Sequence, residues 1–152
     1  MIRIVTDRNE KQAIARAVLE DLTDWFGIPE ARERYIGESA DETMTASWDG
    51  DRPNGFLCLK ETGKETVELA VMGVRKEYHR QGIGKALFAE AKRIACERGY
   101  EFMQVKTVKT GCYEDYDRTN LFYLALGFKE FEVIPTLWDE RNPCQIYVMA
   151  LR

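Results

Sequence analysis

Hydrophobic and polar residues follow two different periods along this chain, and the changes of period predict its elements. Residues 2–5 alternate in polarity, which is typical of a strand. Apolar side chains then recur at helical spacing from Ile14 to Trp25, so this segment is expected to pack one face on a sheet. Pro29 follows, and because proline is favoured in the first turn of a helix, a second helix is expected to begin there.

Strand-like patterns return in the middle of the chain. Strands are expected at residues 44–48, 55–59 and 66–74, with turn-forming residues between them. The last of these, TVELAVMGV, is almost continuously apolar, which is typical of a central strand buried on both faces. A long amphipathic helix is then expected to begin at Gly84 and to end at Gly99, since glycine suits a helix C-terminus.

The last third of the chain is expected to add a strand, a loop, a short helix and two more strands. The expected ranges are 102–108 for the strand, 111–117 for the loop, 119–126 for the helix, 128–134 and 144–151 for the final strands, and 135–143 for an exposed loop between them. This order predicts one domain, residues 1–152, of the α/β (α+β) class. Its sheet should be mixed, mostly antiparallel and of about seven strands, with helices on both faces.

The composition narrows the class of partner. Of the 152 residues, 45% are hydrophobic and 32% are charged, as in ordinary globular proteins. Acidic residues outnumber lysine plus arginine by 26 to 22, so a cationic small molecule is a more natural partner than nucleic acid. Neither a signal peptide nor an apolar run of roughly 18 residues is found, which predicts a cytoplasmic protein with no membrane partner.

The cysteines give no sign of a metal site. Cys58, Cys96, Cys112 and Cys144 are far apart, and none belongs to a C-x-x-C pair. This spacing argues against a zinc site or a redox dithiol, so no metal is expected and the thiols are interpreted as buried side chains.

The turn before the long helix reverses the charge of the chain. Residues 75–85 carry four basic side chains and one acid, whereas the whole chain has a net charge of −4. The first N–H groups of a helix are unpaired and favour an anion, and Gly82 and Gly84 would let a phosphate approach the backbone closely. The turn is neither a P-loop, because Ala86 replaces the required Ser or Thr, nor a dinucleotide fingerprint, because Leu87 replaces the third glycine.

Two segments carry a family resemblance. The run His79-Arg80-Gln81-Gly82-Ile83-Gly84 resembles the Q/R-x-x-G-x-G/A acetyl-CoA loop of the GCN5-related N-acetyltransferase (GNAT) superfamily, with His79 in place of the usual Gln or Arg. The run from Asn120 to Phe128, NLFYLALGF, resembles the second signature of that superfamily, in which a tyrosine precedes Gly-Phe by four residues. The resemblance is strongest over residues 66–134.

The resemblance implies a GNAT fold and transfer of an acetyl group from acetyl-CoA to a primary amine. The implied cofactor-binding residues are Met72, Val74, His79, Arg80, Gln81, Gly82, Ile83, Gly84, Lys85 and Asn120. The resemblance also implies that Tyr123 donates a proton to the departing thiolate and that a backbone N–H between residues 72 and 74 stabilises the oxyanion.

Glu68 is a candidate independently of the family, because it is the only charge within an apolar strand and a buried carboxylate is costly unless it is paired or functional. It precedes His79 by eleven residues, the separation at which the histone acetyltransferase branch places its glutamate base, so the resemblance implies that it accepts the proton of the amine, directly or through water. An outward-facing or ion-paired carboxylate is the structural alternative.

Three aromatic and acidic segments are expected to bind the acceptor. They supply Trp25, Phe26 and Glu30 from the first helical region, Tyr113, Glu114, Asp115 and Tyr116 from the second loop, and Trp138 and Asp139 from the last. A small-molecule amine is the first hypothesis. The alternatives are a protein N-terminus or lysine as acceptor and an acyl-CoA sensor without turnover. The sequence leaves open whether a homodimer completes the site.

Overall fold

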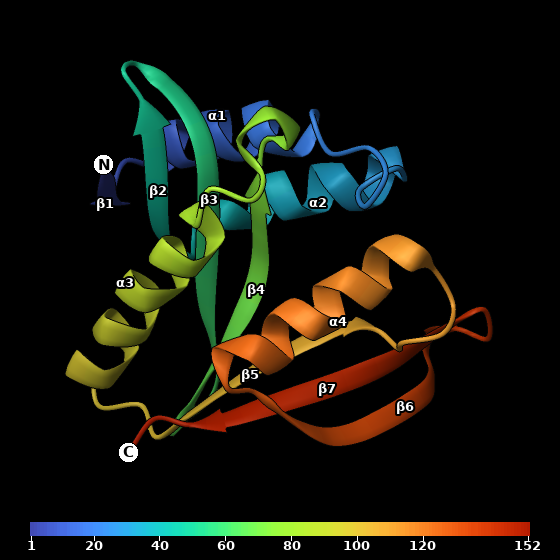
Figure 1. Cartoon of the computed structure of the whole chain (residues 1–152). Helices are drawn as coiled ribbons and strands as arrows, with labels where there is room; N and C mark the ends of the chain where they lie inside the picture. The colour runs from blue at the N-terminus through green and yellow to red at the C-terminus, as the bar shows by residue number, and fades with distance from the viewer.

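A seven-stranded mixed sheet forms the centre of the computed structural model, which describes residues 1–152 (Figure 1). The elements in chain order are β1 (Ile2–Val5), α1 (Arg8–Leu19), α2 (Pro29–Ser39), β2 (Thr43–Asp49), β3 (Arg52–Gly63), β4 (Thr66–Val74), the 3-10 turn η1 (Lys76–Tyr78), α3 (Ile83–Glu97), β5 (Phe102–Val108), α4 (Glu114–Leu126), β6 (Lys129–Asp139) and β7 (Asn142–Ala150). The strand order is β1-β2-β3-β4-β5-β7-β6, and only β4 and β5 pair in parallel. The predicted fold class is therefore confirmed.

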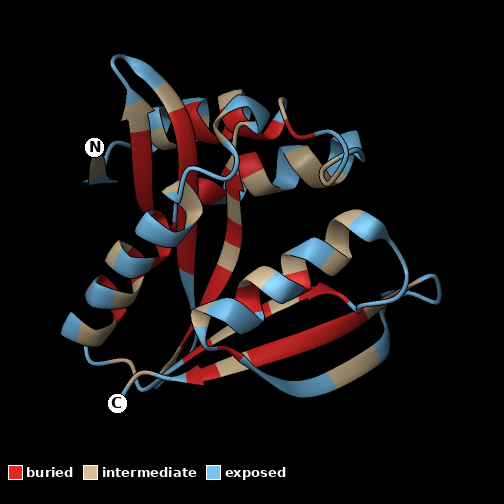
Figure 2. Ribbon diagram, viewed as in Figure 1, coloured by how far each residue is buried: buried red, intermediate tan, exposed pale blue.

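Each face of the sheet has its own apolar core, and both cores appear as buried bands along the strands in Figure 2. Val18, Leu19 and Phe56 belong to the core beneath α1 and α2. Leu57 and Leu87 belong to the core beneath α3 and α4. Phe56 and Leu57 are neighbours in β3, and they enter opposite cores because successive side chains of a strand point to opposite faces.

Strand β4 contains a β-bulge that changes the faces and the direction of its second half. Leu59 of β3 pairs with Leu69, whereas the preceding Cys58 pairs with Val71, so Ala70 is an extra residue in β4. Leu69 and Val71 consequently belong to opposite cores, although residues two apart in a regular strand share a face. Because bulges bend a strand, the second half of β4 is free to leave the direction of β5.

The parallel pair β4–β5 opens after three rungs. Thr66, Val67 and Glu68 pair with residues 102–104 of β5, and no later residue of β4 pairs with β5. Beyond this point β5 continues to pair with β7, and β4 continues to pair with β3. The sheet therefore splays into a V between its two central strands, and Figure 1 shows β4 and β5 diverging between α2 and α4.

Several predicted boundaries were wrong, and strand β3 in particular is longer than the predicted 55–59. Helix α1 ends at Leu19, so Trp25 lies in the connection to α2, and α3 begins at Ile83 because Gly82 forms its N-cap. Helix α4 begins at Glu114 rather than at residue 119, since the acidic residues of its first turn suit a helix N-terminus although they carry no apolar period. Strand β6 extends to Asp139, so the expected loop over 135–143 shrinks to a turn before β7.

No helix of the structure combines the length and the apolar character that a membrane span requires.

Candidate functional site

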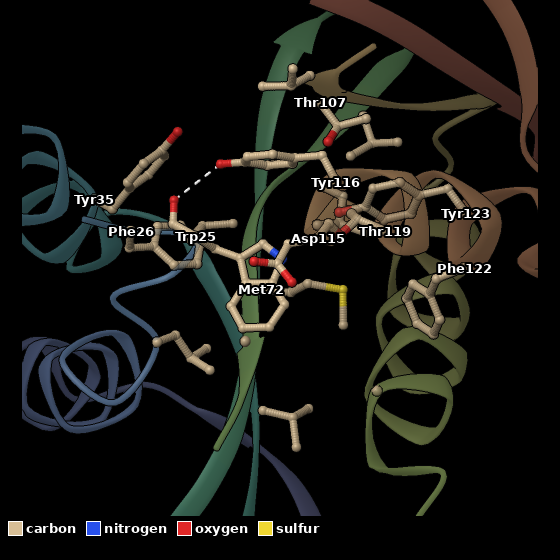
Figure 3. Close-up of a pocket in the computed structure, with 18 of the residues that line it drawn as sticks. Trp25, Phe26, Tyr35, Met72, Thr107, Asp115, Tyr116, Thr119, Phe122 and Tyr123 are labelled. Atoms are coloured by element: carbon tan, nitrogen blue, oxygen red, sulfur yellow. Dashed lines mark hydrogen bonds between the residues drawn. The ribbon is translucent and has the colours of Figure 1, made fainter. Parts of the chain in front are cut away.

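The V between β4 and β5 opens into a cavity of about 900 Å³. Segments far apart in the sequence line it: the connection between α1 and α2, helix α2, the end of β4, the turn before α3, strand β5, helix α4 and the ends of β6 and β7 at their connecting turn. Figure 3 shows that aromatic side chains from the α1–α2 connection, α2 and α4 approach one another across this space. A cavity of this size accommodates a small molecule with most of its surface buried.

One side of the cavity, which we call the glycine wall, consists of Met72, Val74, His79, Arg80 and residues 82–85. Arg80 and Gly82 adopt left-handed backbone conformations, with φ of 65° and 79°. Gly82 is the N-cap of α3 and provides no side-chain cap, so the first N–H groups of this helix remain available to an anion. Arg80 and Lys85 are exposed beside them.

Gly84 serves packing rather than backbone freedom. A Cβ at this position would lie 3.3 Å from the Phe122 ring and 3.5 Å from Cε of Met72. Glycine therefore lets α3, α4 and the end of β4 approach closely around the cavity. Gln81, the remaining residue of the predicted turn, does not line the cavity.

The end of β4 supplies main-chain groups to the V. The Arg75 N–H donates to the Asn54 carbonyl at 2.8 Å, and N–H groups alternate in direction along a strand. The N–H groups of Met72 and Val74 therefore point away from β3, toward the side that β5 has left. His79 contacts the same strand end, with 2.6 Å between its Nε2 and the Val74 carbonyl oxygen.

Tyr123 lies at the base of the cavity on α4 and is 6% exposed. Its ring packs against Phe122, Phe128 and Tyr147, with centroid separations of 5.8 to 6.2 Å. Burial raises the pKa of the Tyr123 hydroxyl, so the group stays protonated at neutral pH. The structure thus places the Tyr123 hydroxyl beside the V, and its role as proton donor stays a prediction.

Glu68 and Asn120 lie outside the lining of the cavity. Glu68 occupies the last paired rung of β4 and β5, and its Oε1 accepts a hydrogen bond of 2.9 Å from Nζ of Lys106, which does line the cavity. Asn120 donates to the carbonyls of Val108 at 2.9 Å and Tyr116 at 2.7 Å, and it accepts from the Tyr147 hydroxyl. The bonds to Val108 of β5 and from Tyr147 of β7 hold α4 on the sheet, and the bond to Tyr116 lies within α4, so both amide hydrogens are already used and the contact of Asn120 with a cofactor stays a prediction.

A second part of the lining, which we call the aromatic wall, consists of Trp25, Phe26, Tyr35, Tyr116 and Trp138, and it meets the glycine wall where the Trp25 ring packs edge-on against His79, with 5.9 Å between ring centroids. The Tyr116 hydroxyl donates to the Trp25 carbonyl at 3.0 Å and joins α4 to the α1–α2 connection across the V (Figure 3). Burial raises the pKa values of both Tyr35 and Tyr116. The wall is therefore mostly apolar, with neutral hydroxyls as its polar groups.

The structure gathers only part of the predicted acceptor set. Trp25, Phe26, Asp115, Tyr116, Trp138 and Asp139 line the cavity, whereas Glu30, Tyr113 and Glu114 do not. Tyr113 instead packs its ring edge-on against Tyr116, with 6.0 Å between ring centroids.

Sequence reasoning missed the contribution of α2. Arg32, Arg34 and Tyr35 of this helix line the cavity together with Lys106 of β5. These residues form no recognisable motif, and the only available signal is that Arg32 and Tyr35 lie three residues apart and so share a helix face.

No group of three or more His, Cys, Asp or Glu side chains lies close enough together to hold a metal ion.

Comparison with known proteins assigns the class. A family model described as the acetyltransferase (GNAT) domain matches residues 39–130, which is more than half of the chain. The chain therefore belongs to the GNAT acetyltransferase family, as the two sequence signatures predicted. Comparison of the sequence with curated proteins finds no match.

Solved structures share the fold over nearly the whole chain at low sequence identity. A GNAT-family protein from Desulfovibrio desulfuricans has a TM-score of 0.86 at 18% identity, covering 100% of this chain and 99% of its own. The ribosomal-protein-S18-alanine N-acetyltransferase from Escherichia coli has a TM-score of 0.78 at 15% identity, covering 99% and 94%. An aminoglycoside 6'-N-acetyltransferase complexed with coenzyme A has a TM-score of 0.75 at 18% identity, covering 99% and 97%.

Proposed function

We propose that this protein is an acetyl-CoA-dependent N-acetyltransferase that acetylates a primary amine of a small molecule. The observation that carries the proposal is the V between β4 and β5, which opens into a cavity beside the uncapped start of α3. Family membership and a structural neighbour that holds coenzyme A in the same fold support it.

The glycine wall fits the phosphate end of this cofactor. The N–H groups at the start of α3 and the basic side chains of Arg80 and Lys85 match the charge of a diphosphate. The free N–H groups of Met72 and Val74 suit an amide-containing arm and the oxygen of a reacting carbonyl. When bound, acetyl-CoA would supply an acetyl thioester, an acyl group already activated for transfer.

Two side chains are proposed to move protons. Tyr123 would donate its hydroxyl proton to the leaving sulfur, since the hydroxyl is protonated at neutral pH and lies beside the V. A primary amine of pKa about 10.4 is mostly protonated at neutral pH, so a base is needed to generate the nucleophile. Glu68 would serve as that base through a water molecule, because its ion pair with Lys106 leaves it behind the cavity lining.

A small acceptor is favoured by the bridge between Tyr116 and Trp25. This hydrogen bond joins the two sides of the V over the cavity and limits the room for a polypeptide chain. An acceptor that enters a closed pocket is correspondingly expected to be compact.

The direct test measures acetyl-CoA binding by calorimetry and thiol release with a broad panel of amines. We expect acetyl-CoA to bind and at least one small amine to be acetylated with stoichiometric release of the thiol. Tight binding without turnover by any amine would contradict the proposal and favour an acyl-CoA sensor. Turnover confined to peptides with a free N-terminus or lysine would favour a protein acetyltransferase.

A further inference from the structure

The charged groups that line the cavity are not equally neutralised. Lys106 pairs with Glu68 and Arg118 pairs with Asp115, whereas Asp139 accepts only from the neutral Arg141 N–H and Asn142 amide, and Arg80 and Lys85 of the glycine wall have no ion pair. Arg32 and Arg34 of α2 pair with no carboxylate, although both line the cavity. The acceptor side therefore carries uncompensated positive charge.

Two buried N–H donors lie on the same side. The Trp25 Nε1 and the Arg32 Nε are buried and have no hydrogen-bond acceptor in the protein. Leaving such a buried donor unsatisfied is destabilising, so a ligand atom that accepts from it would be bound favourably. The other two buried polar atoms without a partner, on Glu42 and Asn54, are oxygens and lie outside the cavity lining. The orphaned donors therefore coincide with the unpaired arginines.

The position of the Arg32 guanidinium is fixed by the chain itself. Its Nη1 donates to the Phe26 carbonyl at 2.9 Å, which holds the side chain beside the α1–α2 connection. Arg34 lies over the ring of Tyr35, with 5.6 Å between Cζ and the ring centroid. A planar guanidinium held in this way is suited to an oxyanion, and it cannot lose its charge to avoid one.

The surroundings of these donors are apolar. Phe26, Ile28 and Tyr35 line the cavity next to them, and every carboxylate of the lining is already engaged. A polycationic acceptor would find unpaired arginines and no free carboxylate. An amine that also carries an oxyanion and an apolar side chain would satisfy the donors and fill the apolar space.

We infer that the acceptor is a carboxylate-bearing amine of the amino acid type, bound with its carboxylate against Arg32, Arg34 and the Trp25 indole N–H. The inference rests on the proposed acetyl transfer and names the substrate class of that same site. A phosphonate or phosphate group has related oxyanion chemistry, so the test includes it as a separate probe.

The test compares matched acceptors by thiol release in the presence of saturating acetyl-CoA. For each amino acid with an apolar side chain, the free acid is compared with its amide, its decarboxylated amine and, for phenylalanine, its aminophosphonate analogue. We expect kcat/KM for the best free acid to exceed that for its amide by at least about tenfold, since charge-assisted hydrogen bonds to the carboxylate are lost. A better aminophosphonate would assign the site to phosphate-type groups and overturn the carboxylate assignment.

Arginine variants test whether Arg32 and Arg34 cause the preference for the free acid. Arg32→Gln combined with Arg34→Gln should raise KM for the free acid by about 10- to 100-fold and leave the amide unchanged, so that the preference disappears. Because Arg32 also holds the Phe26 carbonyl, Arg34→Gln alone serves as the milder variant and should remove part of the preference. Arg93→Gln replaces an exposed arginine of α3 outside the cavity. It should leave KM unchanged for both the free acid and the amide.

The two ways to fail are distinct. If amines without an oxyanion are acetylated as well as the free acids, or if the arginine variants keep the preference, the substrate class is wrong and the acetyltransferase assignment stands. If acetyl-CoA binds and no amine of any class releases thiol, the proposed function itself fails and the substrate class fails with it.

Discussion

The two walls of the cavity are built in different ways. The glycine wall comes from one stretch of chain, residues 72–85, and offers mainly backbone N–H groups at a strand end and a helix start. The aromatic wall is assembled from the α1–α2 connection, α2, α4 and the end of β6, and it offers side chains. Main-chain N–H groups are present whatever the side chains are, so they suit a ligand that stays the same when the sequence varies. Side chains of the aromatic wall can be replaced without disturbing the sheet, so they suit a ligand that differs from one protein to another. Under the proposed function, specificity for the acceptor can therefore change without loss of cofactor binding.

The largest expected effect is at Tyr123, at the base of the cavity between the walls. Tyr123→Phe should lower kcat by about 100-fold, because the proton donor is removed while the ring and its packing remain. Binding of acetyl-CoA, followed by calorimetry, should stay unchanged. Glu68→Gln should lower kcat less than Tyr123→Phe does. Its effect should appear mainly at low pH, because more of the amine is then protonated and needs a base. If both variants kept the wild-type rate on a verified acceptor, neither residue would be catalytic.

A smaller effect, on cofactor binding alone, is expected at Gly82. Alanine at φ of 79° is strained by about 1 to 2 kcal/mol, and relief of that strain would turn the first N–H groups of α3 away from the ligand. Gly82→Ala should therefore raise the Kd for acetyl-CoA by about tenfold and leave KM for the amine unchanged.

Gly50→Ala is the matched control, because Gly50 also has a positive φ, of 61°, and open space around its Cβ, in the turn between β2 and β3. It should cost similar stability in a denaturant titration and leave the Kd unchanged. An equal loss of affinity in both variants would assign the effect to general destabilisation.

The separate construction of the walls also explains what the sequence could predict. The turn from His79 to Gly84 is contiguous, and its chemistry depends on glycine and the start of a helix, both of which show in a local pattern. Tyr123 was found through the Gly-Phe that follows it. Arg32 and Arg34 could not be predicted to line the cavity, because their place there depends on how α2 lies beside the splayed sheet, which no local pattern marks.

A few-fold effect, confined to the acceptor, is expected from the hydrogen bond between Tyr116 and Trp25 within the aromatic wall. Tyr116→Phe removes the 3.0 Å hydrogen bond to the Trp25 carbonyl and frees α4 from the α1–α2 connection. KM for the amine should rise about three- to fivefold, with kcat and acetyl-CoA binding nearly unchanged, and the free energy of unfolding should fall by about 1 kcal/mol. Tyr100→Phe loses a 2.7 Å bond to Glu61 outside the cavity and should leave KM unchanged.

The smallest effect on turnover is expected at Glu42, which lies outside both walls. A substitution there should change the stability of the protein without changing its activity. Burial, together with the nearby charge of Glu38, raises the pKa of the Glu42 carboxyl to about 7. The folded state therefore binds this proton more tightly than the unfolded state, whose ordinary carboxyl titrates near 4.5. The stability that the protonated group provides is complete below pH 4.5 and is lost as the pH rises toward and through 7.

Glu42→Gln keeps the neutral shape at every pH and should remove this loss. Denaturant titrations should give similar free energies of unfolding for both proteins near pH 4 and a variant that is more stable by about 2 kcal/mol at pH 8. Glu65→Gln changes the net charge equally at an exposed position and should not reproduce the gain. Because Glu42 contacts neither wall, kcat/KM at pH 7 should stay the same, and a change in it would show that stability and the site are coupled.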